Sequence, residues 1–356
     1  MKSDASSATL RLPLGLRLAA ATYPLLRSLL FRWDAETAHV QTLRWLSLAG
    51  KTGLLRSPRR LPGRPVECMG LTFPNPVGLA AGLDKDAEAV EGFGAMGFGF
   101  LEVGTLTPQP QAGNPPPRLF RLLPEEAIIN RMGFNNHGVD AAVARLQRHR
   151  YTGVLGVNIG KNKATPNEQA FHDYLYCLEA AHPVADYLAV NFSSPNTPGL
   201  RELQGREALL RLVGGLRKRL DALNQSSQRS VPLAVKIAPD LSDDEIATVA
   251  HALKEAGADG VIATNTTLAR EAISGNPLSG EAGGLSGRPL TERATEVIAC
   301  LRHHLGPDFP LIGVGGILNG SDARAKQEAG AHLIQLYTGF IYRGAALVKD
   351  CLHHLA

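Results

Sequence analysis

The stretch VLGVNIGKN, residues 154–162, carries the pattern that decides the fold. Residues 154–159 form an apolar run with the length and composition of a buried β-strand, and a polar string with glycine and asparagine follows at once. A segment able to form a helix comes next. Such a unit, when repeated, is typical of a parallel sheet whose strands are joined by helices.

The same unit occurs eight times from about residue 76 onward. Eight consecutive units predict an α/β protein with a closed (β/α)₈ (TIM) barrel, which needs about 250 residues. The chain has 356 residues, so one further small unit is expected. Two connections are long: 105–153 carries a proline-rich loop and a predicted hairpin, and 265–310 carries a glycine-rich stretch. The predicted strands are 77–81, 100–104, 154–159, 187–192, 232–237, 260–263, 310–314 and 332–337.

Composition narrows the classes of function. The net charge of +4 is spread along the chain without a basic, aromatic-rich block, which disfavours nucleic-acid binding. The four cysteines form no C-x-x-C pair, and the histidines show no metal-binding spacing, so neither a metal nor a disulfide framework is expected. These cysteines are Cys68, Cys177, Cys300 and Cys351.

Residues 1–60 stand apart from the barrel. Arginines and two prolines, Pro13 and Pro24, interrupt the apolar stretch, and its longest uncharged run, 18–26, is far shorter than the roughly 20 residues of a membrane span. Two pieces, 23–30 and 35–48, are compatible with helices. They form either a helix pair packed on the barrel or an amphipathic hairpin in the membrane interface. In the second case Arg17, Arg27, Arg32 and Arg44 would lie near anionic headgroups.

Polar strings follow the predicted strands directly, and in such a barrel the strand ends meet at one mouth, where active sites lie. After the seventh strand, the amides of Gly313-Val-Gly-Gly316 can approach a phosphate closely, and Tyr337-Thr338 follows the eighth strand. These two loops are the usual phosphate site of such barrels. The alternative for the glycine string is a tight turn.

Two lysines at strand ends, Lys85 and Lys236, would point into the mouth. Because an unpaired buried ammonium is costly, they predict an anionic ligand, unless each pairs with its neighbour Asp84 or Asp240. Asparagines gather in the same strings, and their paired donors and acceptors suit a planar imide such as a pyrimidine, although any one of them can be structural. They are Asn130, Asn158, Asn162, Asn191, Asn196 and Asn265.

The serine pair Ser193-Ser194 lacks a G-x-S-x-G elbow and an obvious histidine partner, which disfavours a hydrolase nucleophile. A serine on this loop, which Pro195 makes rigid, could instead take a proton from a carbon acid next to a carbonyl, if water or a hydroxyl then carries the proton away. The alternative is a capping or turn serine.

Taken in order along nearly the whole chain, these motifs resemble those of dihydroorotate dehydrogenases. Soluble members of that family use a cysteine as base, whereas the quinone-linked class 2 enzymes use a serine and carry an N-terminal helical extension; this sequence has Ser194 and the extension. Phe192 is one departure, a neutral apolar change. The motifs are AGLDK 81–85, NRMGF 130–134, NIGK 158–161, NFSSPNTPGL 191–200, KIAPD 236–240, TNTT 264–267, GLSG 284–287, GVGGI 313–317 and YT 337–338.

The resemblance implies oxidation of (S)-dihydroorotate to orotate through one FMN per chain, with electrons passed to a membrane quinone, in UMP biosynthesis. Ser194 would remove the C5 proton while the C6 hydrogen leaves as hydride to the flavin, and Lys236 would stabilise negative charge on the flavin. The implied substrate-binding residues are Lys85, Asn130, Arg131, Met132, Gly133, Phe134, Asn191, Asn196, Asn265 and Thr266. The implied FMN-binding residues are Ala81, Gly82, Leu83, Asp84, Lys85, Thr105, Asn158, Asn191, Lys236, Thr264, Gly287, Gly316, Tyr337 and Thr338.

The resemblance also favours residues 1–60 as a membrane-docking segment that frames a quinone tunnel, with Arg121 and Tyr337 near its inner end, and residues 61–356 as the FMN barrel. A monomer or weak homodimer, bound peripherally to the cytoplasmic face of a bacterial inner membrane, is expected. Two alternatives remain: an FMN barrel oxidoreductase with a soluble acceptor such as fumarate or NAD, and a non-catalytic barrel that binds a phosphate ligand.

Overall fold

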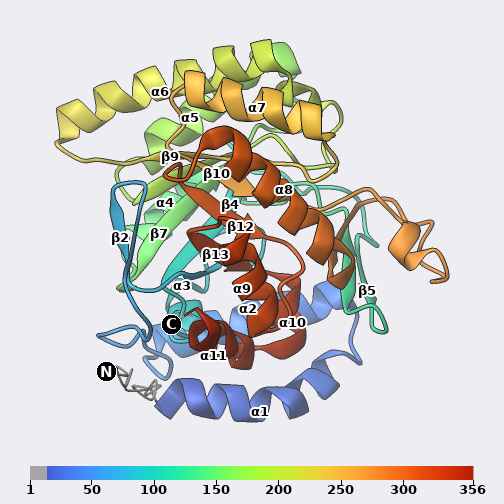
Figure 1. Ribbon diagram of the computed structural model, residues 1–356. Coiled ribbons are helices and arrows are strands. Elements are labelled where there is room, and N and C mark those ends of the chain that lie inside the picture. The colour runs from blue at the N-terminus through green and yellow to red at the C-terminus, as the bar shows by residue number, and fades with distance from the viewer. Residues whose placement is uncertain (1–13, 356) are drawn as a thin grey trace, which may run out of the picture.

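The computed structural model describes residues 14–355, with side chains from residue 20 onward. Its centre is a closed barrel of eight parallel strands whose neighbours follow one another in chain order, so the predicted barrel is confirmed (Figure 1). All eight predicted strands are present, and every residue in them is buried because the barrel interior lies on one side and helices on the other. They are β3 (Val77–Leu79), β4 (Phe100–Leu106), β7 (Val154–Ile159), β8 (Tyr187–Asn191), β9 (Leu233–Ile237), β10 (Gly260–Ala263), β12 (Leu311–Val314) and β13 (Leu333–Leu336).

Amphipathic helices form the outer layer around the barrel (Figure 1). Local sequence fixes the start of one of them: Ser242 caps that helix, and its capping box with Glu245 satisfies two backbone donors. The helices are α3 (Val90–Gly94), α4 (Val139–Leu146), α5 (Ala170–Ala181), α6 (Arg206–Ser227), α7 (Asp243–Glu255), α8 (Thr291–Leu305), α9 (Gly320–Glu328), α10 (Thr338–Arg343) and α11 (Ala345–His354), with short 3₁₀ helices at Asn167–Gln169, Leu200–Gln204, Glu271–Ile273 and Arg288–Leu290.

A small hairpin closes the barrel at the end opposite the mouth. Its strands, β1 (Val66–Cys68) and β2 (Leu71–Phe73), pair in antiparallel fashion. The ring of Phe73 is fully buried and packs edge to face on Phe100, 5.1 Å between centroids, at the first residue of β4. Nothing in the sequence predicted this hairpin, because three-residue strands are too short to show a period.

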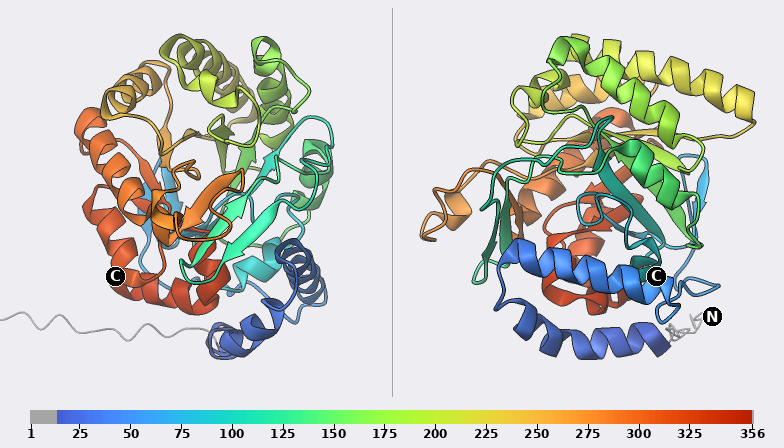
Figure 2. Two further views of the ribbon diagram at one scale, coloured as in Figure 1. Left: turned by 90° about the vertical axis from the view of Figure 1, so that its right-hand side faces the viewer. Right: turned by 180° about the vertical axis from the view of Figure 1, so that it is seen from behind.

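A second small sheet lies over the mouth (Figure 2, left). The hairpin predicted within 105–153 is present as β5 (Leu119–Leu122) and β6 (Ala127–Asn130). The third strand, β11 (Gly284–Gly287), comes from the other long connection and pairs with β6. The two long loops therefore form one roof above the strand ends.

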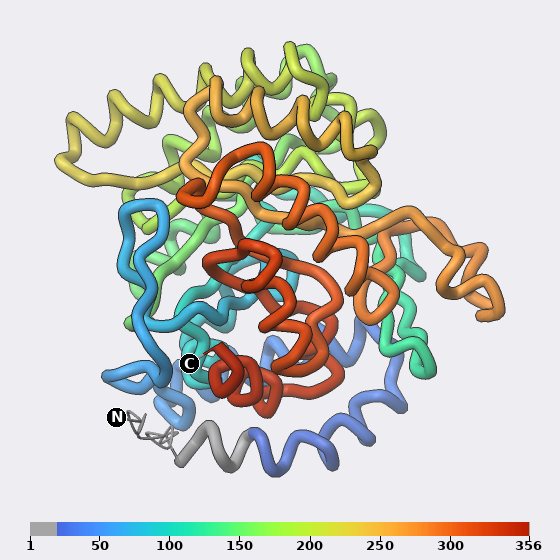
Figure 3. Tube along the Cα trace, in the orientation of Figure 1, coloured from blue at the N-terminus to red at the C-terminus, as the bar shows by residue number. Residues whose placement is uncertain are grey.

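The N-terminal helices α1 (Leu14–Leu30) and α2 (Ala35–Lys51) lie along one side of the barrel, and α1 runs beside α11 near the end of the chain (Figures 1 and 3). The hydroxyl of Tyr23 donates to the carbonyl of Ile341 at 2.5 Å, and Arg27 donates to the carbonyl of Tyr342 at 2.8 Å. An ion pair of 2.7 Å between Glu36 and Arg118 ties α2 to the segment before β5.

The two helices differ from expectation in one respect. The first was predicted from residue 23 onward with Pro24 as a break, whereas α1 begins at Leu14 and continues through Pro24. That part of the prediction was wrong, because the proline's missing donor costs the helix one bond while docking on the barrel holds the rest of it. The side chain of Arg17 lies outside the described residues. None of the helices described here is both long and apolar enough to cross a membrane.

Candidate active site

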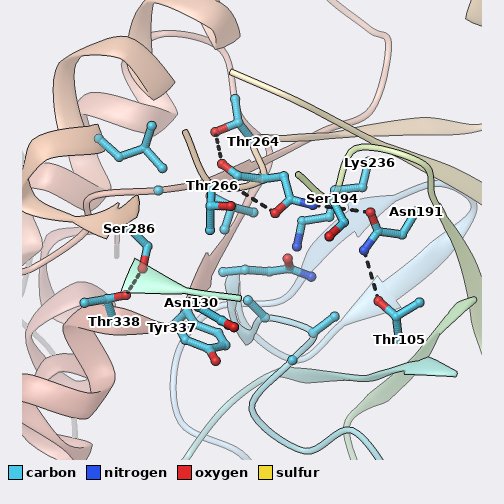
Figure 4. Close-up of a pocket in the computed structure, with 18 of the residues that line it drawn as sticks. Thr105, Asn130, Asn191, Ser194, Lys236, Thr264, Thr266, Ser286, Tyr337 and Thr338 are labelled. Atoms are coloured by element: carbon cyan, nitrogen blue, oxygen red, sulfur yellow. Dashed lines mark hydrogen bonds between the residues drawn. The ribbon is translucent and has the colours of Figure 1, made fainter. Parts of the chain in front are cut away.

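A cavity opens at the mouth of the barrel, beneath the roof, and most of the sequence-predicted residues meet in it (Figure 4). They come from the ends of seven of the eight barrel strands, all but β7, and from the roof, so residues separated by more than 250 positions share one wall. The predicted residues that line it are Ala81, Gly82, Lys85, Thr105, Asn130, Met132, Gly133, Phe134, Asn191, Ser194, Asn196, Lys236, Thr264, Asn265, Thr266, Gly287, Gly316, Tyr337 and Thr338.

Four predicted residues do not line this cavity. The side chain of Arg131 pairs with Glu281 at 2.5 Å and stacks on the ring of Phe120, which holds the roof together. Asp84 accepts hydrogen bonds from the backbone amides of Glu88 and Ala89, and burial raises its pKa to about 6. Of the other two, Asn158 lies beneath the cavity and Leu83 lines a neighbouring one.

Neither lysine at the mouth has a carboxylate partner. Lys85 Nζ donates to the carbonyl of Gly82 at 2.9 Å, and Lys236 Nζ has no hydrogen-bond acceptor among the described residues. Asp84 caps the turn after it, while Asp240 pairs with Arg201 at 2.7 Å. The pairing alternative is therefore wrong.

Burial is the main influence on both lysines. It lowers the pKa of Lys85 from its ordinary value of 10.5 to about 8, and it lowers the pKa of Lys236 as well. The charge of Glu102 acts in the opposite direction on the pKa of Lys236 but is the smaller influence. Two buried ammonium groups that face one cavity without a carboxylate in direct contact favour an anionic ligand.

Amide and hydroxyl groups at the mouth hold one another in place (Figure 4). Asn191 Nδ2 donates to Thr105 Oγ1 at 3.0 Å, and Asn265 Nδ2 donates to Ser193 Oγ at 3.0 Å. Asn162 stands apart, because its amide binds the backbone of Gln109. The remaining amides form a rigid, polar surface suited to a planar ring with imide edges.

Ser194 is buried and lines the cavity beside these amides. Its Oγ accepts a hydrogen bond from the backbone amide of Asn196 at 3.2 Å, which is the turn contact expected of a structural serine. The hydroxyl donates no hydrogen bond within the described part of the chain. The turn therefore fixes the position of the oxygen, while the hydroxyl proton remains available for transfer.

A cradle without side chains lies near the ends of β12 and β13. Gly287 and Gly316 have φ values of 99° and 68°, and a Cβ at either position would collide with backbone atoms. The hydroxyls of Ser286 and Thr338 lie beside the cradle, 2.8 Å apart (Figure 4). Bare backbone and hydroxyl donors are what a phosphate group requires.

Sequence reasoning missed two polar residues inside strands, Gln335 and Glu102. Gln335 lines the cavity from the middle of β13, and Glu102 lies fully buried in β4. The available signal was a polar residue in an otherwise apolar run. Two polar atoms at the cavity, Gln335 Oε1 and Thr266 Oγ1, are buried without a partner among the described residues, so they are available to a ligand.

A second, largely apolar cavity of about 310 Å³ lies between α1, α2 and the barrel. It meets the first one at Met132 and Tyr337, whose side chains line both. His39 and Arg121 are among its few polar residues; burial, and to a smaller extent the charge of Lys85, lower the pKa of His39 to about 3. The Arg121 guanidinium lies 4.6 Å from the centre of the Phe31 ring.

Comparison with known proteins identifies the family to which this site belongs. The family model described as dihydroorotate dehydrogenase matches residues 65–356, which is most of the chain. The chain belongs to the dihydroorotate dehydrogenase family. Enzymes of this family are flavin-dependent oxidoreductases, and the resemblance drawn from the motifs is confirmed.

Relatives in the dihydroorotate dehydrogenase family are close. A protein of Burkholderia cenocepacia named dihydroorotate dehydrogenase (quinone) is 56% identical over 338 residues, which is 95% of this chain and 98% of that protein. One from Burkholderia pseudomallei with the same name is 57% identical over 339 residues, covering 95% and 99%. Among solved structures, the Eimeria tenella enzyme in complex with ferulenol has a TM-score of 0.83 and 42% identity, covering 90% of each chain.

Proposed function

We propose that the protein oxidises (S)-dihydroorotate to orotate with one FMN per chain and passes the electrons to a membrane quinone, in pyrimidine biosynthesis. The observation that carries this proposal is the junction of two cavities at Met132 and Tyr337. One cavity is polar and holds two unpaired lysines. The other is apolar and lies under helices with exposed leucines, as an isoprenoid acceptor would require.

The residues at the mouth fit FMN and substrate. We assign the phosphate to the glycine cradle with Thr338, and the substrate ring to the amides of Asn130, Asn191, Asn196 and Asn265 with Thr266 and Lys85. FMN held by these residues would supply the hydride-accepting chemistry and the route for electrons to the acceptor. Lys236 supplies positive charge where the flavin gains electrons, an electrostatic contribution to the reaction.

Ser194 takes the proton from C5 of dihydroorotate at Oγ. A neutral hydroxyl is a weak base, so it acts only if its own proton moves on as the new one arrives. Its O–H has no acceptor among the described residues, so we assign water as the group that receives that proton and carries it away from the site. Since Asn196 binds the oxygen at 3.2 Å, the proton transfer takes place at a fixed point.

One anaerobic titration tests the function. The purified protein is expected to be yellow, to bleach on addition of dihydroorotate, and to regain its colour with a short-chain quinone. Faster recovery with fumarate or NAD would favour the soluble-acceptor alternative. Failure to bleach would exclude dihydroorotate as the reductant.

The lowered pKa of Lys85 predicts a pH dependence of anion binding. Below pH 8 the side chain is protonated and attracts orotate; as the pH rises through about 8 it loses its charge. We expect orotate affinity to be level from pH 6 to 7.5 and to fall up to about tenfold per unit above 8. The flavin absorbance change reports binding. In Lys85→Met the pH step should vanish; its persistence would assign it to another group.

We also propose that the N-terminal helices dock the protein peripherally on the cytoplasmic face of the inner membrane, as part of a docking segment within residues 1–60, with the enzyme a monomer or weak homodimer. Several large apolar side chains of this segment are exposed to solvent, with basic residues such as Arg32 nearby. Residues 1–13 lie outside the described part. The exposed apolar residues are Leu25 (76%), Leu26, Leu29 (60%), Trp33, Trp45, Leu48 (62%) and Leu54.

The docking proposal predicts that Leu25→Glu with Leu29→Glu weakens binding to anionic lipid vesicles at least tenfold, because two apolar anchors become charged. Co-sedimentation measures the effect. Leu268→Glu is the matched control, since that leucine is 51% exposed but lies in the connection after β10. An equal loss in the control would point to a general charge effect.

A further inference from the structure

Glu102, in the middle of β4, is a buried carboxylate for which the proposed reaction has no use. Three neutral groups donate to its two oxygens. Asn158 Nδ2 donates to Oε1 at 2.8 Å; the Tyr187 hydroxyl and Gln335 Nε2 each donate to Oε2 at 2.7 Å. With donors on both sides, Glu102 acts as a pure acceptor beneath the cavity.

One branch of hydrogen bonds runs from Glu102 to the substrate side of the cavity. Asn158 donates to Glu102 and accepts from the Thr105 hydroxyl at 2.6 Å; Thr105 in turn accepts from Asn191 Nδ2 at 3.0 Å. Every bond points towards the carboxylate. Because an amide has one donor end and one acceptor end, this branch fixes the donor end of Asn191 towards Thr105, while the backbone amide of Ser193 donates to Asn191 Oδ1 at 3.3 Å on the other side.

The second branch is shorter and consists of Gln335 alone. Its Nε2 donates to Glu102, so its Oε1 is turned away from the carboxylate. That oxygen is buried without a partner in the described part of the chain, and the residue lines the cavity. A fixed, unpaired acceptor in a flavin site suits a ring N–H.

We propose that Glu102 is a positioning residue whose carboxylate fixes the amide orientations of Asn191 and Gln335, and thereby the hydrogen-bonding atoms that the cavity presents to substrate and flavin. The inference rests on the proposed function. A carboxylate lets both branches donate towards it. A neutral amide at position 102 can accept on one side only, so at least one branch must reverse or lose a bond.

The test uses Glu102→Gln in the full-length, flavin-loaded protein. Orotate affinity is measured from the flavin absorbance, FMN affinity from the fluorescence of released flavin, and retention of the fold from thermal melting. At least one affinity is expected to fall tenfold or more. Tyr187→Phe is the control, because Tyr187 does not line the cavity and Gln335 Nε2 loses only its longer contact of 3.3 Å with the Tyr187 hydroxyl while keeping its 2.7 Å bond to Glu102. Both affinities should stay within threefold. Unchanged affinities in Glu102→Gln overturn the proposal.

Double variants distinguish a positioning role of Glu102 from a general disturbance of the fold. Thr105→Val interrupts the first branch and should weaken orotate binding; Gln335→Met removes the second and should weaken FMN binding. When Glu102→Gln is combined with Thr105→Val, orotate affinity should fall no further than in the single variants, and the same should hold for FMN affinity when it is combined with Gln335→Met. Additive losses in both double variants overturn the proposal.

A Glu102→Gln variant that does not fold and a failure of the proposed function give different results. If Glu102→Gln does not fold, the branch variants decide, and unchanged affinities in both overturn the proposal. If dihydroorotate failed to bleach the unmodified protein, the proposed function would be contradicted. The proposal for Glu102 would still be tested, because orotate and FMN affinities are measured without turnover.

Discussion

Ser194→Ala is expected to give a yellow protein that binds orotate but is no longer bleached by dihydroorotate at a useful rate. Alanine removes the only atom of this side chain that can take the C5 proton, and a general base contributes about 10²–10⁴-fold. The backbone turn should survive, because the lost bond to the Asn196 amide is a single weak contact of 3.2 Å. Anaerobic stopped-flow absorbance measures the reduction rate.

The neighbouring serine provides a control. Ser193 is fully buried, binds Asn191 and Asn265 through its hydroxyl, and does not line the cavity. Ser193→Ala should loosen these amides and slow reduction by about tenfold or less, in keeping with the loss of ordinary hydrogen bonds. If Ser194→Ala were reduced as fast as the unmodified protein, Ser194 would not be the base.

Ala38→Trp is expected to leave the rate of reduction by dihydroorotate unchanged. It should lower the rate of reoxidation by quinone at least about 10²-fold. Ala38 is buried on α2 and lines the apolar cavity of about 310 Å³, so an indole there would occupy the space that we assign to the acceptor. The polar cavity does not include this residue. Single-turnover absorbance, with dihydroorotate first and a quinone second, measures the two halves of the reaction separately.

Thr37→Trp is the matched control, because Thr37 precedes Ala38 on the same helix but is exposed and lines neither cavity. It should reoxidise normally. Normal quinone kinetics in Ala38→Trp would show that the acceptor uses another route, whereas loss of both half-reactions would mean that the substitution distorts the barrel.

The barrel could be predicted from sequence because a strand buried on both sides must be apolar throughout. The same reason places chemistry at strand ends, where runs such as 154–159 give way to polar strings. Pairing of β11 with β6 had no local signal, since the partners lie more than 150 positions apart. Gln335 and Glu102 could not be predicted as site residues because they lie inside strands whose other residues are mostly apolar. At such positions a polar side chain serves the site rather than the packing of the core.

The apolar cavity also could not be predicted. Its wall consists of residues such as Leu43, Phe93 and Ile341, and in a sequence these are indistinguishable from ordinary core. Only their arrangement leaves a space between them. The exposed leucines on α1 were visible as an apolar face, but the sequence left open whether the barrel or a membrane covers it.

The wall that Met132 and Tyr337 form between the two cavities has a consequence for inhibition. Under the proposed function, electrons would pass from one cavity to the other past these two side chains. A compound lodged in the apolar cavity would block the exit of electrons without touching the place where dihydroorotate sits. Raising the concentration of dihydroorotate would not displace such a compound, so its potency would be set by competition with the quinone alone.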